Sequence, residues 1–345
     1  MSASVERCDL APGLTVPRII TGMWQVADME REGRTLDLDA AAGAMELYVN
    51  AGLTAFDMAD HYGSAEDIAG KLSRRTLPSS VQLFTKWVPK PGPISRADVT
   101  RAVETSLRRL RTDHLDLLQF HAWVYEDPSW LDALRFLHEL VGQGLISHLG
   151  LTNFDTEHLL VALDRGIDIV SNQICLSLLD RRAAEMMQQV CLSRNVKLLA
   201  YGSLAGGFLT KRWLGQPAPR LGDLETHSQM KYWRFINAAG SWDMFQSLLA
   251  AVHRVAERNG VSMANVAARY VLDQPAVCGV IIGARLSQSE HIADTLRLFE
   301  FSLDSESRGV LDSAVGDLHP LPGDCGDEYR KPPFLTAAGD LSDHL

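Results

Sequence analysis

The chain reads Leu53-Thr54-Ala55-Phe56-Asp57, then Val81-Gln82-Leu83-Phe84-Thr85-Lys86, then Leu115-Asp116-Leu117-Leu118-Gln119-Phe120-His121. Each stretch has the length and composition of a buried strand, and helix-like segments separate the three. The carboxyl ends of consecutive parallel strands meet at one edge of a sheet. This edge is therefore predicted to gather four polar side chains, namely Asp57, Tyr62, Lys86 and His121.

The alternation of strand and helix continues from about residue 17 to about residue 297. Apolar runs predict strands at 17–23, 53–56, 81–86, 114–120, 146–151, 167–176, 196–201 and 277–282. Helical spacing predicts helices at 37–51, 65–74, 130–141, 156–164, 183–194 and 289–298, and one that starts at the capping box Ser95-x-x-Asp98. Eight strand–helix units predict a (β/α)8 TIM barrel as a single domain over residues 1–345.

A doubly wound sheet is the alternative architecture, but it usually has fewer strands and a Gly-x-Gly-x-x-Gly turn after the first one. Here Met23-Trp24-Gln25-Val26 follow the first predicted strand. The long connection at 202–240, after the seventh strand, is rich in Gly, Pro, Arg and aromatic residues, which is more typical of a functional loop. Two helices are predicted after it, at 242–259 and 262–272. The tail from Gly323 is expected to cover an opening or to be partly disordered.

Composition argues against several classes of protein. The net charge of -10 argues against a nucleic-acid surface, and no apolar stretch approaches membrane-spanning length. The 5 cysteines are scattered without a Cys-x-x-Cys pair, so neither a disulfide framework nor a metal site is expected. Residues 1–10 lack the apolar core of a secretory signal. We expect a soluble cytoplasmic protein that acts on a small molecule.

The four polar side chains suit proton transfer. Asp57 and Lys86 follow runs that should be buried, and their mutual pairing would give both charges a partner. A free tyrosine titrates near ~10 and donates poorly near neutral pH. An ammonium about 4 Å away, at an effective dielectric near 20, interacts with a phenolate by roughly 4 kcal/mol, which moves the pKa of a phenol toward neutrality. Tyr62 beside Lys86 is therefore predicted to be a proton donor.

Several motifs together resemble those of the aldo-keto reductase superfamily. Phe-Asp-Met-Ala-Asp-His-Tyr-Gly at 56–63, Thr-Lys at 85–86 and Asp116-Leu117-x-x-x-His121 resemble its catalytic signatures. Residues 144–153 resemble its second signature, and 200–210 resemble its pyrophosphate loop. Gly-Ala-Arg at 283–285 resembles the start of its third signature. The matches run in family order from about residue 17 to residue 300.

The resemblance implies a barrel that binds an extended NADP(H) and reduces carbonyls by hydride transfer. Tyr62 would be the general acid, Lys86 would promote its proton release, Asp57 would anchor Lys86, and His121 would orient the carbonyl oxygen. Thr152, Asn153 and Gln173 match the positions that hold the nicotinamide carboxamide, and Tyr201 matches the aromatic residue that stacks on the nicotinamide. The remaining predicted cofactor residues are Gly202, Leu204, Gly206, Leu209, Gly283 and Arg285. Aromatic residues just after strands are predicted to line the substrate pocket, namely Trp24, Trp87 and Trp123.

The chain departs from the family pattern at the adenosine end of the cofactor. The family commonly places a basic or amide residue and a Glu-Asn pair after the last strand, and this chain has Ser289, Ile292 and Ala293 there. Arg285 would then bind the 2′-phosphate, with Lys211 or Arg212 as further candidates, because arginine suits phosphate. NADP(H) is the favoured cofactor, and NAD(H) is the alternative.

Two other functions stay open at this point. The chain resembles the potassium-channel β subunits as well, which share this fold, so a cofactor-sensing regulatory subunit with little turnover is one alternative. An aldolase or isomerase barrel that uses Lys86 as a Schiff-base amine is the other. The sequence does not name the carbonyl or alcohol substrate, the physiological direction or the oligomeric state.

Overall fold

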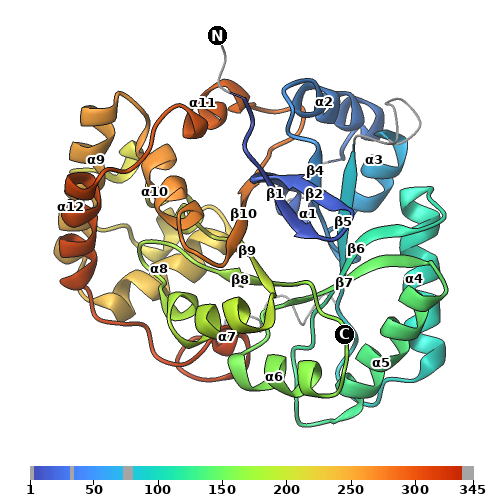
Figure 1. The fold of residues 1–345 in the computed structure, drawn as a ribbon. Coiled ribbons are helices and arrows are strands. Elements are labelled where there is room, and N and C mark those ends of the chain that lie inside the picture. The colour runs from blue at the N-terminus through green and yellow to red at the C-terminus, as the bar shows by residue number, and fades with distance from the viewer. Residues whose placement is uncertain (1–3, 32–34, 73–80, 336–345) are drawn as a thin grey trace.

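The computed structural model describes residues 4–31, 35–72 and 81–335. Within these residues, eight parallel strands close a barrel in the order β10-β3-β4-β5-β6-β7-β8-β9 (Figure 1). The strands are β3 (Ile19–Gly22), β4 (Ala55–Asp57), β5 (Gln82–Trp87), β6 (Leu115–Phe120), β7 (Ile146–Thr152), β8 (Ser171–Cys175), β9 (Lys197–Tyr201) and β10 (Val277–Gly283). The predicted (β/α)8 TIM barrel is confirmed.

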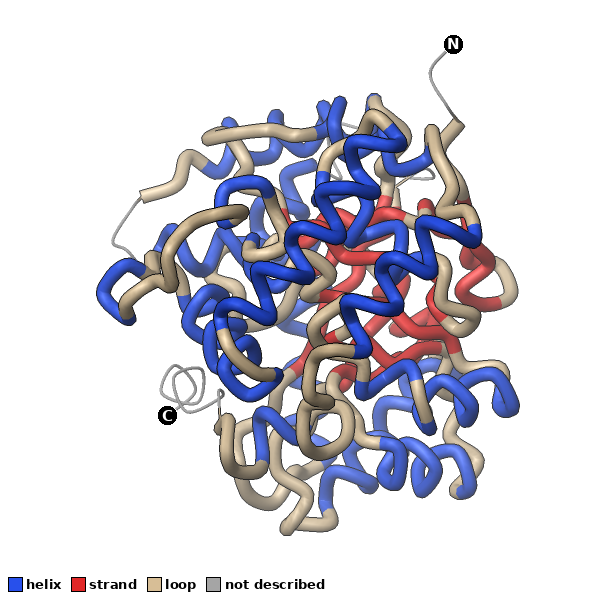
Figure 2. The backbone as a smooth tube through the Cα atoms, turned by 90° about the vertical axis from the view of Figure 1, so that its left-hand side faces the viewer, coloured by secondary structure: helices blue, strands red, loops and turns tan. Residues whose placement is uncertain are grey.

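Helices surround the strands on the outside of the barrel, as Figure 2 shows. Barrel strands have side chains packed on both faces, and every residue of β3, β4 and β8 is accordingly buried. Among the described residues, no helix is long and apolar enough to cross a lipid bilayer. The α-helices of the described residues, in sequence order, are α1 (Trp24–Arg31), α2 (Leu38–Asn50), α3 (Ala65–Leu72), α4 (Arg96–Leu110), α5 (Ser129–Gly142), α6 (Thr156–Asp164), α7 (Met186–Arg194), α8 (His227–Ala239), α9 (Trp242–Asn259), α10 (Met263–Leu272), α11 (Ile292–Leu296), α12 (Ser305–Gly316) and α13 (Asp327–Arg330).

The helix predicted from the capping box begins where the sequence places it. The Ser95 hydroxyl accepts a hydrogen bond from the Asp98 N–H, and the Asp98 carboxylate accepts one from the Ser95 N–H at 3.0 Å. These two bonds satisfy donors that would otherwise be unpaired at the start of α4. Arg111 ends the helix in the left-handed conformation, with φ of 57°. Local chemistry therefore determines both ends of α4.

A hairpin that the sequence reading did not predict closes the amino-terminal end of the barrel. It consists of β1 (Arg7–Ala11) and β2 (Leu14–Pro17), which are antiparallel. Leu10 and Val16 pack in one cluster with interior barrel residues such as Ile20 and Phe84. Pro17 accordingly belongs to the hairpin and not to the first barrel strand. The Pro-Gly pair at 12–13 was the available turn signal.

The region at 202–240 is only partly a loop, so the predicted long connection requires correction. Short 3₁₀ turns at 205–207, 211–213 and 221–223 are followed by the helix α8 (His227–Ala239). Thr226 caps α8 by accepting a hydrogen bond from the Gln229 N–H. The helices α1 (Trp24–Arg31) and α12 were also not predicted. The last two residues of the helix predicted at 65–74 lie outside the described residues.

The described part of the tail packs back across the barrel mouth through a buried charge network. Helix α13 (Asp327–Arg330) carries Glu328, whose side chain is fully buried. Its carboxylate accepts hydrogen bonds from Arg182 Nη2 at 2.9 Å and from Lys231 Nζ at 3.2 Å. Arg182 Nη2 also donates to Asp180 Oδ2 at 2.6 Å. The network therefore joins α8, α13 and the loop after β8, and residues 336–345 lie outside the described part.

Burial alone would raise the pKa of Glu328, but the Lys231 and Arg182 cations outweigh it and hold this pKa at about 2. Replacing Glu328→Gln removes the shared anion and leaves two buried cations short of a partner. We expect this change to lower the free energy of unfolding by about 3–5 kcal/mol, measured by urea denaturation near neutral pH. Glu306→Gln is the control, because the exposed Arg258–Glu306 pair should change stability by less than about 0.5 kcal/mol.

The stability lost in Glu328→Gln should depend on pH. A carboxyl whose pKa is lowered by folding stabilises the protein above its ordinary value of 4.5, and this contribution disappears as the pH falls toward about 2. The stability difference between wild type and Glu328→Gln should therefore shrink on acidification through that range. A difference that stays constant down to the acid transition contradicts the assigned role of the network.

Candidate active site

Three neighbouring strands and the loop after one of them bring the four predicted catalytic side chains to the carboxyl end of the barrel. Asp57 is the last residue of β4, Lys86 lies in β5, and His121 directly follows β6. Tyr62 lies in the loop between β4 and α3. The register pairs Asp57 with Phe84 and Lys86 with Gln119, so the ends of these strands lie side by side.

The ammonium of Lys86 is buried and hydrogen-bonded at the end of the barrel. Its Nζ donates to Asp57 Oδ2 at 2.6 Å and to the Met58 carbonyl oxygen at 2.9 Å, and the residue is 2% exposed. Burial lowers the pKa of Lys86 below its ordinary value, and the Asp57 carboxylate partly offsets this effect. The two charges compensate each other. This pairing was expected from the sequence, because Asp57 and Lys86 lie at the ends of apolar runs predicted to be buried strands.

The other oxygen of Asp57 is satisfied by two buried amides. Asp57 Oδ1 accepts from Gln119 Nε2 at 2.9 Å and from Gln173 Nε2 at 2.7 Å. Gln173 also donates to Gln119 Oε1 at 2.8 Å. Gln173 was predicted to hold the nicotinamide carboxamide, but here its side chain binds and orients Asp57. Gln119 was not predicted, although it precedes His121 by two residues and shares its side of the strand.

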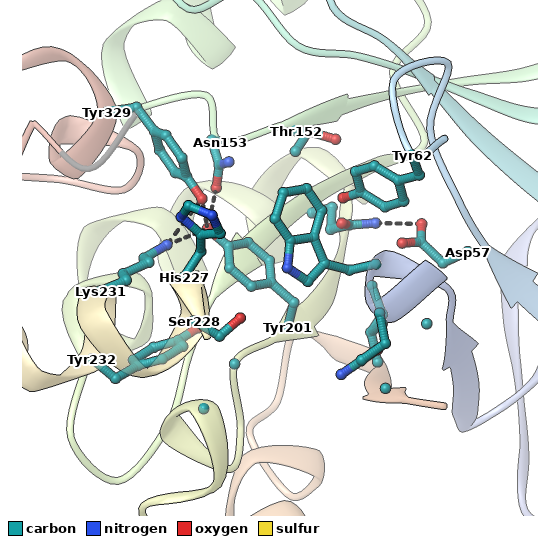
Figure 3. A pocket seen from close by; sticks show the side chains of 18 of the residues that line it. Asp57, Tyr62, Thr152, Asn153, Tyr201, His227, Ser228, Lys231, Tyr232 and Tyr329 are labelled. Carbon is teal, nitrogen blue, oxygen red and sulfur yellow. Dashed lines mark hydrogen bonds between the residues drawn. The ribbon is translucent and has the colours of Figure 1, made fainter. Parts of the chain in front are cut away.

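Tyr62 lies over this ion pair (Figure 3) and has two aromatic neighbours. Its ring centroid is 4.9 Å from Lys86 Nζ. The edges of Trp24 and His61 contact the ring, each with 4.9 Å between centroids. The phenol therefore packs against two aromatic rings, and the Lys86 ammonium lies beside its own ring. Such a cation stabilises the negative charge that a phenol oxygen develops when it gives up its proton.

His121 is held through both nitrogens of its ring. Its Nδ1 accepts a hydrogen bond from Trp123 Nε1 at 2.8 Å, and its Nε2 lies 3.3 Å from the side-chain nitrogen of Asn153. Burial and then the nearby Arg330, Lys86 and Lys231 cations hold the pKa of His121 well below its ordinary value. The imidazole is accordingly neutral at physiological pH.

A cavity of about 420 Å³ opens beside these side chains. Predicted catalytic residues, cofactor residues and aromatic pocket residues line it together. The predicted residues that line the cavity are Trp24, Asp57, Tyr62, Lys86, His121, Trp123, Thr152, Asn153, Gln173, Tyr201, Gly202, Leu204, Gly206 and Gly283.

Three predicted site residues lie elsewhere. Trp87 neighbours Lys86 in β5, so its side chain points to the opposite side of the strand and packs against Phe120, with 5.5 Å between ring centroids. Leu209 is fully buried in the apolar core beneath α8. Arg285 is exposed after β10 and does not line the cavity. None of these three residues lines the cavity.

Glycines in the loop after β9 allow α8 to approach the cavity. A Cβ atom on Gly202 would lie 2.0 Å from Tyr232 Oη, and one on Gly206 would lie 2.8 Å from Tyr232 Cδ2. Both glycines also have positive φ angles, 72° and 63°, which other residues rarely adopt. These positions thus serve the packing of the helix as well as any ligand in the cavity.

Residues from α8 and α13 complete the far wall of the cavity, and the sequence reading did not predict them as site residues. Lys231 Nζ donates to Tyr329 Oη at 2.9 Å and to Tyr201 Oη at 3.2 Å (Figure 3). The i, i+4, i+7 spacing of His227, Lys231 and Arg234 was the available signal, since it places all three on one face of α8. That signal was hidden because the segment was interpreted as a loop.

One group of potential metal ligands exists among the described residues. Cys175, Asp180 and Glu328 place their ligand atoms within 4.8 Å of one another. Arg182 and Lys231 already bind the two carboxylates, which makes this cluster part of the charge network.

The cavity has the donors and the flat apolar surface that a nicotinamide dinucleotide requires. Thr152 Oγ1 and Ser203 Oγ are buried without a hydrogen-bond partner among the described residues. A buried hydroxyl of this kind costs about 1–3 kcal/mol unless a ligand satisfies it. Tyr201, the last residue of β9, presents its ring to the same space. The residues present therefore fit the cofactor that the sequence resemblance implies.

Comparisons with known proteins agree with this geometry. The model of the aldo/keto reductase family matches residues 18–315. Aldo-keto reductase YhdN of Bacillus subtilis is 26% identical over 341 residues, which cover 93% of this chain and 96% of that protein. An aldo/keto reductase from Klebsiella pneumoniae, solved in complex with NADP and acetate, is 25% identical with a TM-score of 0.68, covering 92% of this chain and 97% of that chain. The glycerol dehydrogenase of Gluconobacter oxydans has the same fold, with a TM-score of 0.76 at 24% identity over 94% of this chain and 98% of that chain.

The family match extends over most of the residues that build the barrel and its mouth. It covers every strand of the barrel and all four residues of the predicted catalytic group. The chain therefore belongs to the aldo/keto reductase family.

Proposed function

We propose that this protein is an NAD(P)(H)-dependent oxidoreductase that reduces aldehyde or ketone carbonyls to alcohols, or catalyses the reverse oxidation. One observation carries the proposal: a buried ammonium, Lys86 Nζ, is bound to Asp57 at 2.6 Å and lies 4.9 Å from the ring centroid of Tyr62. The family to which the chain belongs and its NADP-bound relatives support the oxidoreductase chemistry.

In this proposal Tyr62 holds the proton that the reaction consumes. The carbonyl oxygen of the substrate lies near Tyr62 Oη and His121 Nε2 and accepts a hydrogen bond from each. As negative charge develops on that oxygen, Tyr62 Oη gives it the proton, and the Lys86 ammonium stabilises the charge left on the phenol. The bound nicotinamide supplies the hydride. In the oxidative direction the same groups take the proton back.

Thr152 and Asn153 would hold the nicotinamide carboxamide, and Tyr201 would stack against the ring. Thr152 suits this role because its buried hydroxyl lacks a partner among the described residues. Leu204 and Gly206, which line the cavity in the loop after β9, would bind the diphosphate. NADP(H) is the favoured cofactor, in line with the Klebsiella pneumoniae relatives solved with NADP and with NADPH. Exposed Arg285 is the proposed ligand of the 2′-phosphate.

The two alternative functions are less well supported by the geometry. A Schiff base requires a free amine lone pair, but Lys86 Nζ already donates to Asp57 and to the Met58 carbonyl group. A regulatory subunit without turnover does not require all four catalytic groups at one cavity, and here they share one.

Replacing Tyr62→Phe removes the proton donor and keeps the ring that packs against Trp24. We expect kcat for carbonyl reduction to fall by about 10²- to 10⁴-fold, with cofactor affinity nearly unchanged. Stopped-flow and steady-state assays across a panel of aldehydes and ketones measure kcat, and fluorescence titration measures cofactor affinity. Tyr270→Phe is the matched control, since it removes a hydroxyl that binds Asp312 at 2.9 Å outside the cavity. Full turnover in Tyr62→Phe would falsify the assigned role.

Replacing Arg285→Ala should separate the two cofactors. If Arg285 binds the 2′-phosphate, the variant loses a charge-assisted bond worth about 1.5–3 kcal/mol, so NADPH binds about 10- to 100-fold more weakly. NADH lacks that phosphate, so its Kd should stay the same. Arg194→Ala, on the exposed end of α7, serves as the control. Equal weakening of both cofactors, or of neither, rejects Arg285 as the phosphate ligand.

A further inference from the structure

The hydrogen bond between Trp123 and His121 determines which nitrogen of the imidazole carries the proton. Trp123 Nε1 lies 2.8 Å from His121 Nδ1, and both residues are buried. An indole N–H donates and has no lone pair to accept with. His121 Nδ1 is therefore the acceptor and carries no proton. Because the imidazole is neutral in its buried, cation-rich surroundings, its proton lies on Nε2.

This assignment also determines how the side chain of Asn153 is oriented. As placed, Asn153 Nδ2 lies 3.3 Å from His121 Nε2, and Oδ1 lies 2.8 Å from Tyr201 Oη. Two N–H groups would then face each other at His121. Oxygen and nitrogen of an amide are assigned from the hydrogen-bond network, and turning the amide over removes the conflict. Asn153 Oδ1 then accepts from His121 Nε2, and its Nδ2 donates to Tyr201 Oη.

Every group along the resulting chain of hydrogen bonds has a suitable partner. Tyr201 Oη accepts from Asn153 and from Lys231 Nζ at 3.2 Å, and its own proton points to Glu328 Oε1 at 3.4 Å. Lys231 donates to Glu328 as well. The chain begins at the indole of Trp123 and ends at the buried carboxylate of Glu328. No donor in it faces another donor.

The backbone of Asn153 is fixed independently of its side chain. Asn153 has a φ of 55°, in the left-handed region that asparagine tolerates better than most residues. Its N–H donates to the Gln173 carbonyl at 2.8 Å, and its carbonyl accepts from Arg330 Nη1 at 2.8 Å. The amide therefore has a fixed base from which it reaches both His121 and Tyr201.

We propose that Trp123 is a positioning residue that holds His121 as the Nε2–H tautomer, and that Asn153 receives this proton until a substrate carbonyl replaces it. The effect on rate rests on the proposed carbonyl-reducing function, whereas the tautomer itself does not. The Nδ1–H tautomer would present a lone pair to the carbonyl oxygen and repel it. Trp123, predicted as a wall of the substrate pocket, thus gains a second role through His121.

The experiment measures the tautomer directly in the cofactor-free protein. Long-range ¹H–¹⁵N spectra of protein with ¹⁵N-labelled histidine distinguish Nε2–H from Nδ1–H imidazole, and the signal missing in His121→Asn identifies His121. Wild type should show the Nε2–H form alone, and Trp123→Phe should show both forms. Trp242→Phe is the matched control, because it also loses an indole hydrogen bond, to the Gln216 carbonyl at 2.8 Å, outside the cavity. It should leave the His121 signal unchanged.

Kinetics then test the positioning role. Trp123→Phe should lower kcat/KM for carbonyl reduction about 10- to 100-fold, the range seen when a residue that orients a histidine ligand is removed, while the Kd for NADPH stays the same. An Nδ1–H signal in wild type, or a pure Nε2–H signal in Trp123→Phe, overturns the tautomer assignment. A changed tautomer with unchanged kcat/KM overturns the positioning role.

The tautomer and the proposed function are tested by separate measurements. If Trp123→Phe does not fold, the wild-type spectrum alone decides the tautomer. Failure of the proposed function appears separately, as full turnover in Tyr62→Phe, and leaves the tautomer result in place.

Discussion

The active end of this barrel depends on one buried ion pair, between Lys86 and Asp57 on adjacent strands. A charge removed from water is costly unless a partner and further hydrogen bonds compensate it. Here the ammonium also donates a hydrogen bond to the Met58 carbonyl, and the carboxylate also accepts hydrogen bonds from Gln119 and Gln173. These groups come from β4, β5, β6 and β8, so the pair is satisfied only when the strands are in register. The same geometry places a cation beneath Tyr62.

A second charge network closes the cavity from the other side. Arg182 and Lys231 face the carboxylates of Asp180 and Glu328, so two cations meet two anions in a buried space. Asp180 and Arg182, Lys231 and Glu328 belong to segments far apart in the chain, which the folded barrel brings together. Through Tyr201 and Asn153 this network reaches His121, so the groups that hold the tail and the groups proposed to act on the substrate form one connected set.

The parts that followed from local patterns were predicted well. Buried runs gave the barrel strands, the capping box gave the start of α4, and the carboxyl ends of the strands placed Asp57, Lys86 and His121 at one cavity. The pattern of β5 could also have excluded Trp87, because adjacent strand residues point to opposite sides and Lys86 already faces inward. The amino-terminal hairpin was missed although the Pro-Gly pair at 12–13 signals a turn, and α8 was missed because the Gly and Pro residues of 202–240 suggested a loop.

The sequence by itself determined the barrel and which residue types stand at its mouth, because strand burial and helix capping depend on residues close together in the chain. Only the tertiary structure decided that α8 and α13 build the far wall. It also decided that Gln173 turns to Asp57 and that Trp123 donates to His121. These contacts depend on distances between segments that no local spacing fixes, and on the requirement that every buried donor finds an acceptor.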